Sequence, residues 1–363
     1  MGHGTLRCAV ARCGAVRSGK VWCGWLRFVM NILVTGGTGS FGTAFMKAAL
    51  GWPDVERLVC YSRDEHKQQR LHAELGDDPQ DRLRFFLGDV RDQQRLQMAL
   101  HGISHCVHGA ALKVVPWLEY NPSEGLKTNT LGAMHLVDAA IQVGVGAVVA
   151  LSTDKAVSPV NLYGASKLAA EKLFLAANAL GGGRCRFTAV RYGNVTGSTG
   201  SVVPLWRAKA KADEGLPLTD DRMTRFWMSM DEAVELVRKA LIDGCGGEVL
   251  IPKLPSYRVT DLAEAVWREQ NPTSEWRAKY KAIGIRPGEK LHESLVSEDE
   301  WPWTYDCGTH YEVVHVANGG PGGRSVDATV SGRRVPDGFK YRSDENERWL
   351  TKAELQQRLL AIP

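Results

Sequence analysis

The 363-residue sequence lacks a long hydrophobic run. Its most apolar stretch, residues 131–151, is interrupted by His135, Asp138 and Gln142. A transmembrane helix needs about 20 consecutive, predominantly apolar residues, so we predict that no helix crosses a membrane. With 44% hydrophobic and 24% charged residues, the chain has the composition of a soluble protein that forms one large domain or two smaller ones.

Paired cysteines are also missing. Three of the eight cysteines lie within the first 30 residues, and the other five are scattered without the spacings of zinc sites or disulfide frameworks. The five scattered residues are Cys60, Cys106, Cys185, Cys245 and Cys307. This distribution suits a reducing compartment. We therefore expect a cytoplasmic protein without a bound metal.

Acidic residues are absent from the first 30 positions, which carry five basic residues. With five of the 45 basic residues in this segment, the rest of the chain has 40 basic and 41 acidic residues. The net charge of +4 is therefore no argument for nucleic-acid binding. The segment resembles an organellar transit peptide in composition. Because Met30 directly precedes the first predicted strand, we favour a disordered or non-native extension over residues 1–29.

From Met30 onward, short apolar runs alternate with helical segments, which predicts an α/β fold with a doubly wound parallel Rossmann sheet. We assign the nucleotide-binding domain to residues 30–196. Beyond them the pattern loosens, and we expect residues 197–363 to form mainly a smaller, substrate-binding lobe over the carboxyl ends of the strands. Segments around 225–250 are expected to return to the first domain. The predicted strands lie at 31–35, 57–62, 83–90, 105–111, 147–153 and 186–195.

The first predicted strand is followed by GGTGSFG and then by a helical segment. Glycines spaced as GxxGxxG permit a tight turn and a close approach of the backbone to a pyrophosphate at the helix N-terminus. The alternative is a tight turn without a ligand. At the chain's first strand we favour a dinucleotide-binding loop. The loop residues predicted to contact the cofactor are Gly36, Thr38, Gly39, Ser40, Phe41 and Gly42.

The end of the second strand indicates which dinucleotide is bound. An acidic residue there favours NAD, whereas Ser62, Arg63 and Lys67 suit the 2′-phosphate of NADP. Asp64 stands beside them and weakens this distinction. We predict NADP.

Asp89 and Val90, at the end of the third predicted strand, are candidates for contacts with the adenine edge of the cofactor. The alternative for Asp89 is a helix N-cap, since aspartate is common at that position.

Residues 152–167 read STDKAVSPVNLYGASK and follow the fifth predicted strand. Tyr163 and Lys167 are four residues apart, so both project from one helix face. An ammonium beside a tyrosine stabilises the phenolate and lowers the pKa of the phenol. Lys167 can also contact the nicotinamide ribose, and Thr153 can hold a substrate hydroxyl. This set is the pattern of short-chain dehydrogenases. The alternative is an exposed Tyr and Lys on a surface helix.

Asp154 and Lys155 add an acid and a base that a simple dehydrogenase does not need. Once C4 of a sugar is a ketone, the C5 proton becomes acidic, and a base can remove it while an acid protonates the departing C6 hydroxyl. Lys155 suits the base and Asp154 the acid, if burial or neighbours lower the pKa of Lys155. The alternative is a salt-bridged turn after a strand.

Many ordered motifs from about residue 30 to the C-terminus resemble those of the inverting UDP-N-acetylglucosamine 4,6-dehydratases. These are extended short-chain dehydrogenase/reductases that start pseudaminic acid and related bacterial sugar pathways. Retaining relatives have Asp-Glu where this chain has Asp154-Lys155, which favours the inverting branch. The motifs are TGGTGSFG, YSRDE, FFLGDVRD, AALK, EYNP, STDKA, NLYGASK, RYGNV, GSVVP, MTRFW and IGIRPGEKLHE.

The resemblance implies an NADP-dependent lyase that converts UDP-N-acetylglucosamine to UDP-2-acetamido-2,6-dideoxy-β-L-arabino-hex-4-ulose. It also implies a UDP-sugar bound between the lobes and a homo-oligomer, possibly a hexamer. Two alternatives stay open: a UDP-sugar 4-epimerase, and a non-catalytic NADP-sensing protein. The substrate-binding residues implied are Lys113, Asn194, Val203, Arg225, Arg286 and Glu289.

Two positions depart from the family pattern. Val114 stands where close members usually have His, and Thr199 stands where they usually have Arg. The loss of a cation near a phosphate weakens UDP-sugar binding or alters the sugar preferred. The residues of the chemistry are intact, so we retain the reaction.

Overall fold

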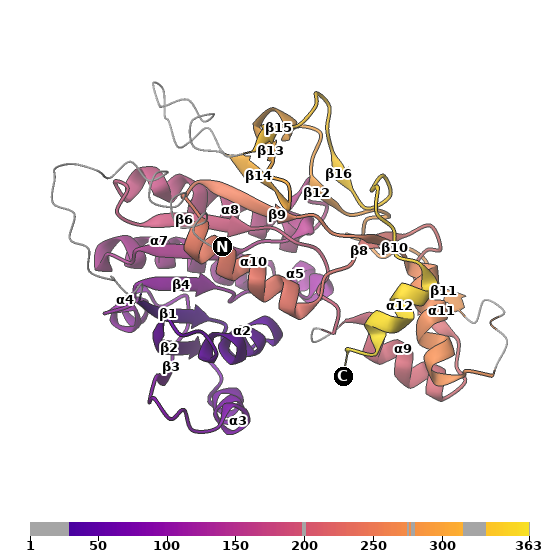
Figure 1. Ribbon diagram of the computed structural model, residues 1–363, viewed down its shortest axis with the longest axis horizontal. Helices are drawn as coiled ribbons and strands as arrows, with labels where there is room; N and C mark the ends of the chain where they lie inside the picture. Colours follow the sequence, from indigo (N-terminus) through magenta and orange to yellow (C-terminus); the bar gives the residue numbers. More distant parts are fainter. Residues whose placement is uncertain (1–28, 198–200, 274–275, 277–279, 315–331, 363) are drawn as a thin grey trace, which may run out of the picture.

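The computed structural model describes residues 29–197, 201–273, 276, 280–314 and 332–362 (Figure 1). The expectation for the N-terminal extension, apart from residue 29, and the departure at Thr199 lie outside these residues.

A ten-stranded sheet forms the centre of the described structure, in the order β15-β13-β14-β9-β6-β5-β4-β1-β2-β3 (Figure 1). The strands from β3 to β9 pair in parallel. The predicted doubly wound parallel sheet is therefore confirmed, and each of the six predicted strands is present. The parallel strands are β1 (Met30–Thr35), β2 (Val55–Ser62), β3 (Leu83–Leu87), β4 (His105–His108), β5 (Ala147–Leu151), β6 (Arg186–Val190) and β9 (Glu248–Pro252).

Helices cover both faces of this sheet because its strands are apolar on both sides. Along β1, Ile32 and Val34 belong to one hydrophobic cluster with α2 and α10, while Leu33 belongs to a second cluster with α4, α7 and α8. This is the two-residue alternation of a strand. The helices around the parallel strands are α2 (Ser40–Leu50), α3 (Glu65–Leu75), α4 (Gln93–Leu100), α5 (Val115–Tyr120), α6 (Pro122–Leu126), η1 (Lys127–Leu131), α7 (Gly132–Val143), α8 (Leu162–Leu180) and α10 (Met230–Asp243).

Beyond β9 the sheet continues with antiparallel strands that the sequence analysis did not predict. These strands fall largely in a region without family motifs, and they are short. They are β14 (His310–Val314), β13 (Thr304–Asp306) and β15 (Arg333–Arg334), with the turn η3 (Trp301–Trp303) before β13.

A smaller group of helices and short strands has its own core, in which Trp206, Trp227 and Trp267 are buried. Helices α9, α11 and α12 lie together at one end of the molecule, on the right of Figure 1. The elements of this lobe and its junction are η2 (Asp154–Ala156), α9 (Val202–Lys211), β7 (Leu216–Leu218), β8 (Thr224–Phe226), β10 (Ser256–Arg258), α11 (Val259–Gln270), β11 (Tyr280–Ala282), β12 (Ser294–Val296), β16 (Tyr341–Arg342) and α12 (Lys352–Leu359).

Helix α12 begins with a capping box. Thr351 Oγ1 accepts a hydrogen bond from the N–H of Glu354, whose side chain accepts one from the N–H of Thr351. Leu350 and Leu355 on either side are buried in the same cluster. Among the described residues, no helix is both long enough and apolar enough to span a membrane.

Candidate functional site

The glycine-rich loop runs from the end of β1 into α2. Gly36 has φ +71°, and a Cβ there would lie 2.8 Å from the backbone nitrogen of Ala110. A Cβ on Gly42 would lie 2.4 Å from the carbonyl oxygen of Gly36. Gly39 is the N-cap of α2 and brings no capping side chain. The loop therefore has the shape that a dinucleotide pyrophosphate requires.

At the end of β2, the buried Ser62 hydroxyl accepts a hydrogen bond from Gln68 Nε2 at 3.0 Å. Asp64 is the N-cap of α3 and accepts a hydrogen bond from the N–H of Lys67 at 3.0 Å. Its carboxylate therefore caps α3, which argues against a hydrogen bond between this carboxylate and the ribose of the cofactor. Arg63 is 52% exposed and lies 3.4 Å from Asp89.

The alternative reading of Asp89 as a helix N-cap is wrong, because Asp92 caps α4 through the N–H of Arg95. Asp89 instead accepts hydrogen bonds from the backbone and guanidinium of Arg91. Burial raises the pKa of Asp89, but these bonds and the charge of Arg63 outweigh it and lower the pKa below its ordinary value. Val90 beside it is buried.

The turn after β5 gathers Thr153, Asp154 and Lys155. Thr153 Oγ1 donates to Asp154 Oδ1 at 2.9 Å, and Lys155 Nζ donates to the same oxygen at 3.1 Å. The Asp154 side chain is buried, and a Cβ at Gly193 would come within 3.1 Å of its Oδ2. The glycine of RYGNV therefore leaves room for this carboxylate.

Lys155 Nζ also donates to Glu293 Oε1 at 3.2 Å and to Asn194 Oδ1 at 3.4 Å. Burial lowers the pKa of Lys155, but the two carboxylates outweigh it and raise the pKa above its ordinary value. The condition set in the sequence analysis, a lowered pKa for Lys155, is therefore wrong for this arrangement. The pKa of Asp154 is raised by burial and by the charge of Glu293, which favours its protonated, acidic form.

The sequence analysis missed Glu293. It is the last residue of the motif IGIRPGEKLHE, from which only Arg286 and Glu289 were selected. Glu293 is 2% exposed. A buried carboxylate needs a charged partner, and that partner, Lys155, lies 138 residues away in the sequence. The sequence signal that could have identified Glu293 is its position in this motif.

Tyr163 and Lys167 lie on α8, whose N-cap Asn161 accepts a hydrogen bond from the N–H of Gly164 at 2.7 Å. Burial lowers the pKa of Lys167 to about 8, although Glu171 opposes this. Burial raises the pKa of Tyr163. The charge of the Lys155 ammonium partly offsets this increase in the pKa of Tyr163. The sequence predicted that Lys167 would have this effect.

Gly164 is where α8 touches the Asp154–Lys155 turn. A Cβ at this position would lie 2.1 Å from the carbonyl oxygen of Lys155. We expect Gly164→Ala to destabilise the protein by about 1–3 kcal/mol, because the backbone must move to admit the methyl group. It also displaces Lys155, so turnover should fall. Thermal unfolding and activity assays test this.

The matched control is Gly215→Ala, where the added methyl meets only the Cβ of Lys281 at 4.0 Å. We expect a change within about 0.5 kcal/mol there. Equal unfolding temperatures and activities for Gly164→Ala and the wild type would contradict the tight contact at Gly164.

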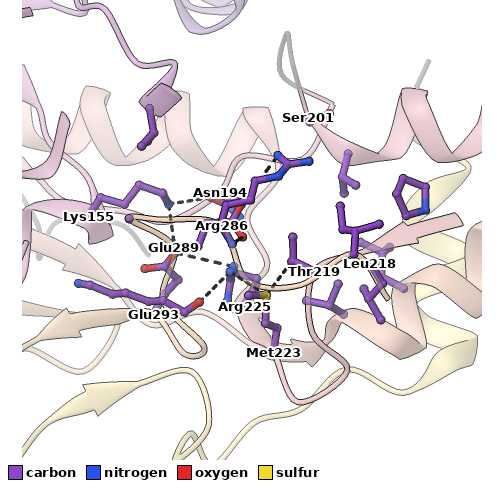
Figure 2. Close-up of a pocket in the computed structure, with 18 of the residues that line it drawn as sticks. Lys155, Asn194, Ser201, Leu218, Thr219, Met223, Arg225, Arg286, Glu289 and Glu293 are labelled. Atoms are coloured by element: carbon purple, nitrogen blue, oxygen red, sulfur yellow. Dashed lines mark hydrogen bonds and ion pairs between the residues drawn. The ribbon is translucent and has the colours of Figure 1, made fainter. Parts of the chain in front are cut away.

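A cavity of about 540 Å³ opens beside Lys155 (Figure 2). This volume is within the range of small-molecule sites. One part is polar and includes Lys155, Asn194 and Glu293, whereas Leu205, Trp206, Pro217 and Leu218 give another part an apolar wall. The cavity therefore joins the turn after β5 to residues of the smaller lobe.

Of the residues implied as substrate contacts, Asn194, Arg225, Arg286 and Glu289 line this cavity (Figure 2). Arg286 is 59% exposed, with Glu289 Oε1 3.9 Å away. Its guanidinium is therefore accessible to an anion.

Val203 is a correction to the predicted substrate contacts. Its side chain is 1% exposed and packs in the core of the smaller lobe. On α9 the cavity is lined instead by Val202, Leu205 and Trp206. Lys113 is exposed and is not part of the cavity lining, and Val114 beside it is also exposed.

Arg225 lines the cavity, but its N–H groups are directed mainly at the protein. Nη1 donates to the carbonyls of Thr224 and Leu291, and Nη2 donates to the carbonyl of Lys290 and to Met223 Sδ. Nε lies 3.7 Å from Glu293 Oε1. In this arrangement Arg225 stabilises the cavity wall and contributes positive charge. Its N–H groups are not available for a bidentate contact with a ligand.

One further cluster has metal-ligating side chains. The ligand atoms of Cys307, His310 and Glu312 lie within 4.8 Å of one another on the β13–β14 hairpin. His310 and Glu312 are hydrogen-bonded to each other at 3.0 Å. None of the three lines the cavity, so this cluster has no part in the site described above.

Comparison with known proteins decides the family. Residues 32–315 match the family described as polysaccharide biosynthesis protein. A UDP-N-acetylglucosamine 4,6-dehydratase (inverting) from Campylobacter jejuni is 43% identical over 90% of this chain and 96% of its own. The chain belongs to the family of these dehydratases. The family resemblance expected from the motifs is confirmed, and with it the assignment to a family of enzymes.

Other relatives share most of the chain. A UDP-glucose 4-epimerase from Rickettsia felis is 40% identical over 78% of this chain and 82% of its own. Pen from Bacillus thuringiensis has a TM-score of 0.82 at 33% identity, over 93% of this chain and 100% of its own. DesIV, a dTDP-glucose 4,6-dehydratase from Streptomyces venezuelae solved with NAD and TYD, has a TM-score of 0.63 at 25% identity, over 72% and 87%.

Proposed function

We propose that the protein catalyses the 4,6-dehydration of UDP-N-acetylglucosamine with inversion at C5, giving UDP-2-acetamido-2,6-dideoxy-β-L-arabino-hex-4-ulose and water. The observation that carries the proposal is the buried Asp154 carboxyl hydrogen-bonded to Lys155, which lines the cavity. This is an acid and a base side by side, next to the Tyr163 and Lys167 helix. The similarity to the Campylobacter jejuni dehydratase supports the same reaction.

The cofactor we propose is a nicotinamide dinucleotide, and the glycine cradle at Gly36 and Gly42 fits one. When bound, NADP supplies the hydride acceptor for oxidation at C4 and the hydride donor at C6. Thr153 holds the C4 hydroxyl, and Tyr163 takes its proton. Lys167, buried beside them with a pKa near 8, positions the ribose.

Lys155 then removes the C5 proton, and Asp154 protonates the C6 hydroxyl as it leaves as water. A proton from solvent adds to C5 on the opposite face, which inverts this carbon. Their raised pKa values favour an ammonium and a carboxylic acid. Loss of one proton from the pair gives the form with an amine and a carboxylic acid, which is the form this reaction needs. Arg286 and Glu289 lie where the cavity can receive the nucleotide diphosphate.

A UDP-sugar 4-epimerase is the second candidate, favoured by the similarity to the Rickettsia felis protein. Epimerisation needs the Tyr163 and Lys167 pair but no acid and base at C5 and C6. The mass of the product separates the two. We expect loss of one water from UDP-N-acetylglucosamine. A product of unchanged mass would replace the dehydratase proposal with the epimerase.

We propose NADP rather than NAD because Arg63 and Lys67 flank the end of β2 while Asp64 serves as a helix cap. Arg63→Ala should raise the KM for NADP about 10-fold or more. A change of this size corresponds to the loss of one hydrogen bond to a charged group. The KM for NAD should change little. Steady-state kinetics with both cofactors measure this.

The control for this change is Arg84→Ala, which removes an exposed guanidinium on β3 that is paired with Asp81. It should leave both KM values near those of the wild type. If Arg63→Ala raises the KM for NAD as much as that for NADP, Arg63 does not read the 2′-phosphate.

We further propose a pathway and a cellular compartment for the enzyme. The product suits pathways to pseudaminic acid and related bacterial sugars. Cys60, Cys106 and Cys185 are buried cysteines that form no disulfide, which suits the cytoplasm. We also propose a homo-oligomer, as the family resemblance implies.

A further inference from the structure

We propose that Glu293 is a positioning residue that holds the Nζ of Lys155 from the segment before β12 and balances its charge, leaving Asp154 to carry the acidic proton. The inference rests on the proposed dehydration, because it assigns the partner of the base in that reaction. It concerns a residue that none of the motif-based predictions selected.

Hydrogen bonds to Ser343, the residue after β16, fix the backbone of Glu293. Its N–H donates to Ser343 Oγ at 3.0 Å, and its carbonyl accepts from the N–H of Ser343 at 2.9 Å. Ser343 Oγ in turn lies 2.7 Å from Thr224 Oγ1 and donates to the Thr224 carbonyl. The backbone of Glu293 is therefore held on both sides, so its side chain points across the cavity with little freedom.

The side chain meets Lys155 at the junction of the two parts of the molecule (Figure 2). Lys155 follows β5 of the sheet, whereas Glu293 directly precedes β12. The distance of 3.2 Å between Lys155 Nζ and Glu293 Oε1 matches the 3.1 Å to Asp154 Oδ1. Lys155 is thus shared between a carboxylate of its own turn and one from a segment 138 residues away in the sequence.

Glu293 has a second oxygen without a partner. Oε2 is buried and makes no hydrogen bond within the described structure. Leaving a buried carboxylate oxygen unpaired is costly. The positive charges of Lys155, Arg225 and Lys290 around Glu293 offset this cost.

The charged groups around Lys155 and Glu293 determine the pKa values of these residues. Arg225 and Lys290 bring positive charge toward Glu293 and, with Lys155, outweigh the effect of burial, so the pKa of Glu293 is lowered. Glu293 therefore carries the negative charge, and the nearby Asp154 carboxyl is driven toward its protonated form. The charged and titratable groups around Lys155 and Glu293 are Asp154, Tyr163, Arg225, Tyr257 and Lys290.

Glu293→Gln keeps the shape and removes the charge, so it tests this role. An ammonium that loses a carboxylate partner has a lower pKa, and a carboxyl that loses a like charge also has a lower pKa. Both limbs of the pH profile of kcat/KM for water loss should therefore move to lower pH, by about 1–3 units. Glu293→Asp retains the charge, and its limbs should stay near the wild-type positions even where its rate is reduced.

The same shift can be measured without turnover. Competitive acetylation of the native protein with acetic anhydride, followed by mass spectrometry of the Lys155 peptide, gives the pH at which this amine becomes reactive. In Glu293→Gln the midpoint should move down by the same 1–3 units. The matched control is Glu214→Gln, which breaks an exposed pair with Lys209 and should leave the midpoint of Lys155 unchanged.

Unchanged limbs and an unchanged midpoint in Glu293→Gln would overturn the proposal. Absence of water loss from the wild-type protein would instead overturn the proposed function, and the acetylation midpoint would still decide the role of Glu293. If Glu293→Gln unfolds, Glu293→Asp keeps the test open, because a midpoint far below that of the wild type would contradict a role based on charge.

Discussion

Lys155→Ala should reduce the rate of water loss by about 10²–10⁴-fold while leaving the first oxidation step in place. The expected result is reduced nicotinamide that forms when UDP-N-acetylglucosamine is added and is not followed by dehydration. Lys155 lines the cavity and donates a hydrogen bond to Asp154, so its amine is placed to act as the C5 base. Removing its amine takes away the C5 base. It also removes a charge that lowers the pKa of Tyr163, so we expect oxidation at C4 to slow, but by less than water loss.

Stopped-flow absorbance of reduced nicotinamide, combined with mass spectrometry of the product, measures the two steps separately. The control is Lys239→Ala, which removes an exposed lysine of α10 that is paired with Asp243. It should behave as the wild type. If Lys155→Ala dehydrates at the wild-type rate, the assignment of Lys155 as base is refuted.

Tyr163→Phe should have a comparably large effect at an earlier step. We expect about 10²–10⁴-fold slower oxidation at C4, so that neither reduced nicotinamide nor water loss appears. The phenylalanine ring keeps the packing of the half-buried Tyr163 and removes only the hydroxyl. That hydroxyl is next to Thr153 and within the influence of the Lys155 charge.

The two variants are informative together because they stop the reaction at different points. An oxidation step that is normal in Tyr163→Phe would show that another group takes the C4 proton. Thermal unfolding of both variants serves as the control for folding, and we expect midpoints close to that of the wild type for Tyr163→Phe.

The sequence predicts the sheet well because its signals are local. Each parallel strand from β1 to β6 is a short, mainly apolar run, and the glycines of the turn after β1 have a recognisable spacing in the sequence. The set Thr153, Asp154 and Lys155 is likewise contiguous. Its members could therefore be selected before any fold was known.

What the sequence could not show depends on contacts between distant segments. The pKa of Lys155 is raised by Asp154 and also by Glu293, which is distant in the sequence, and the place of Val203 is set by the packing of α9 in the core of the smaller lobe. Arg225 uses its N–H groups on the carbonyls of Leu291 and Lys290. The strands β13 to β15 pair across the sheet edge without a motif to mark them.

The most direct test of the central claim is proton NMR of the product formed from UDP-N-acetylglucosamine by the purified protein in D₂O. The account predicts loss of one water, deuterium at C5 and the L-arabino configuration, because Lys155 removes the C5 proton and the carbon is reprotonated on the opposite face. A dehydrated product with the D-xylo configuration would contradict inversion at C5.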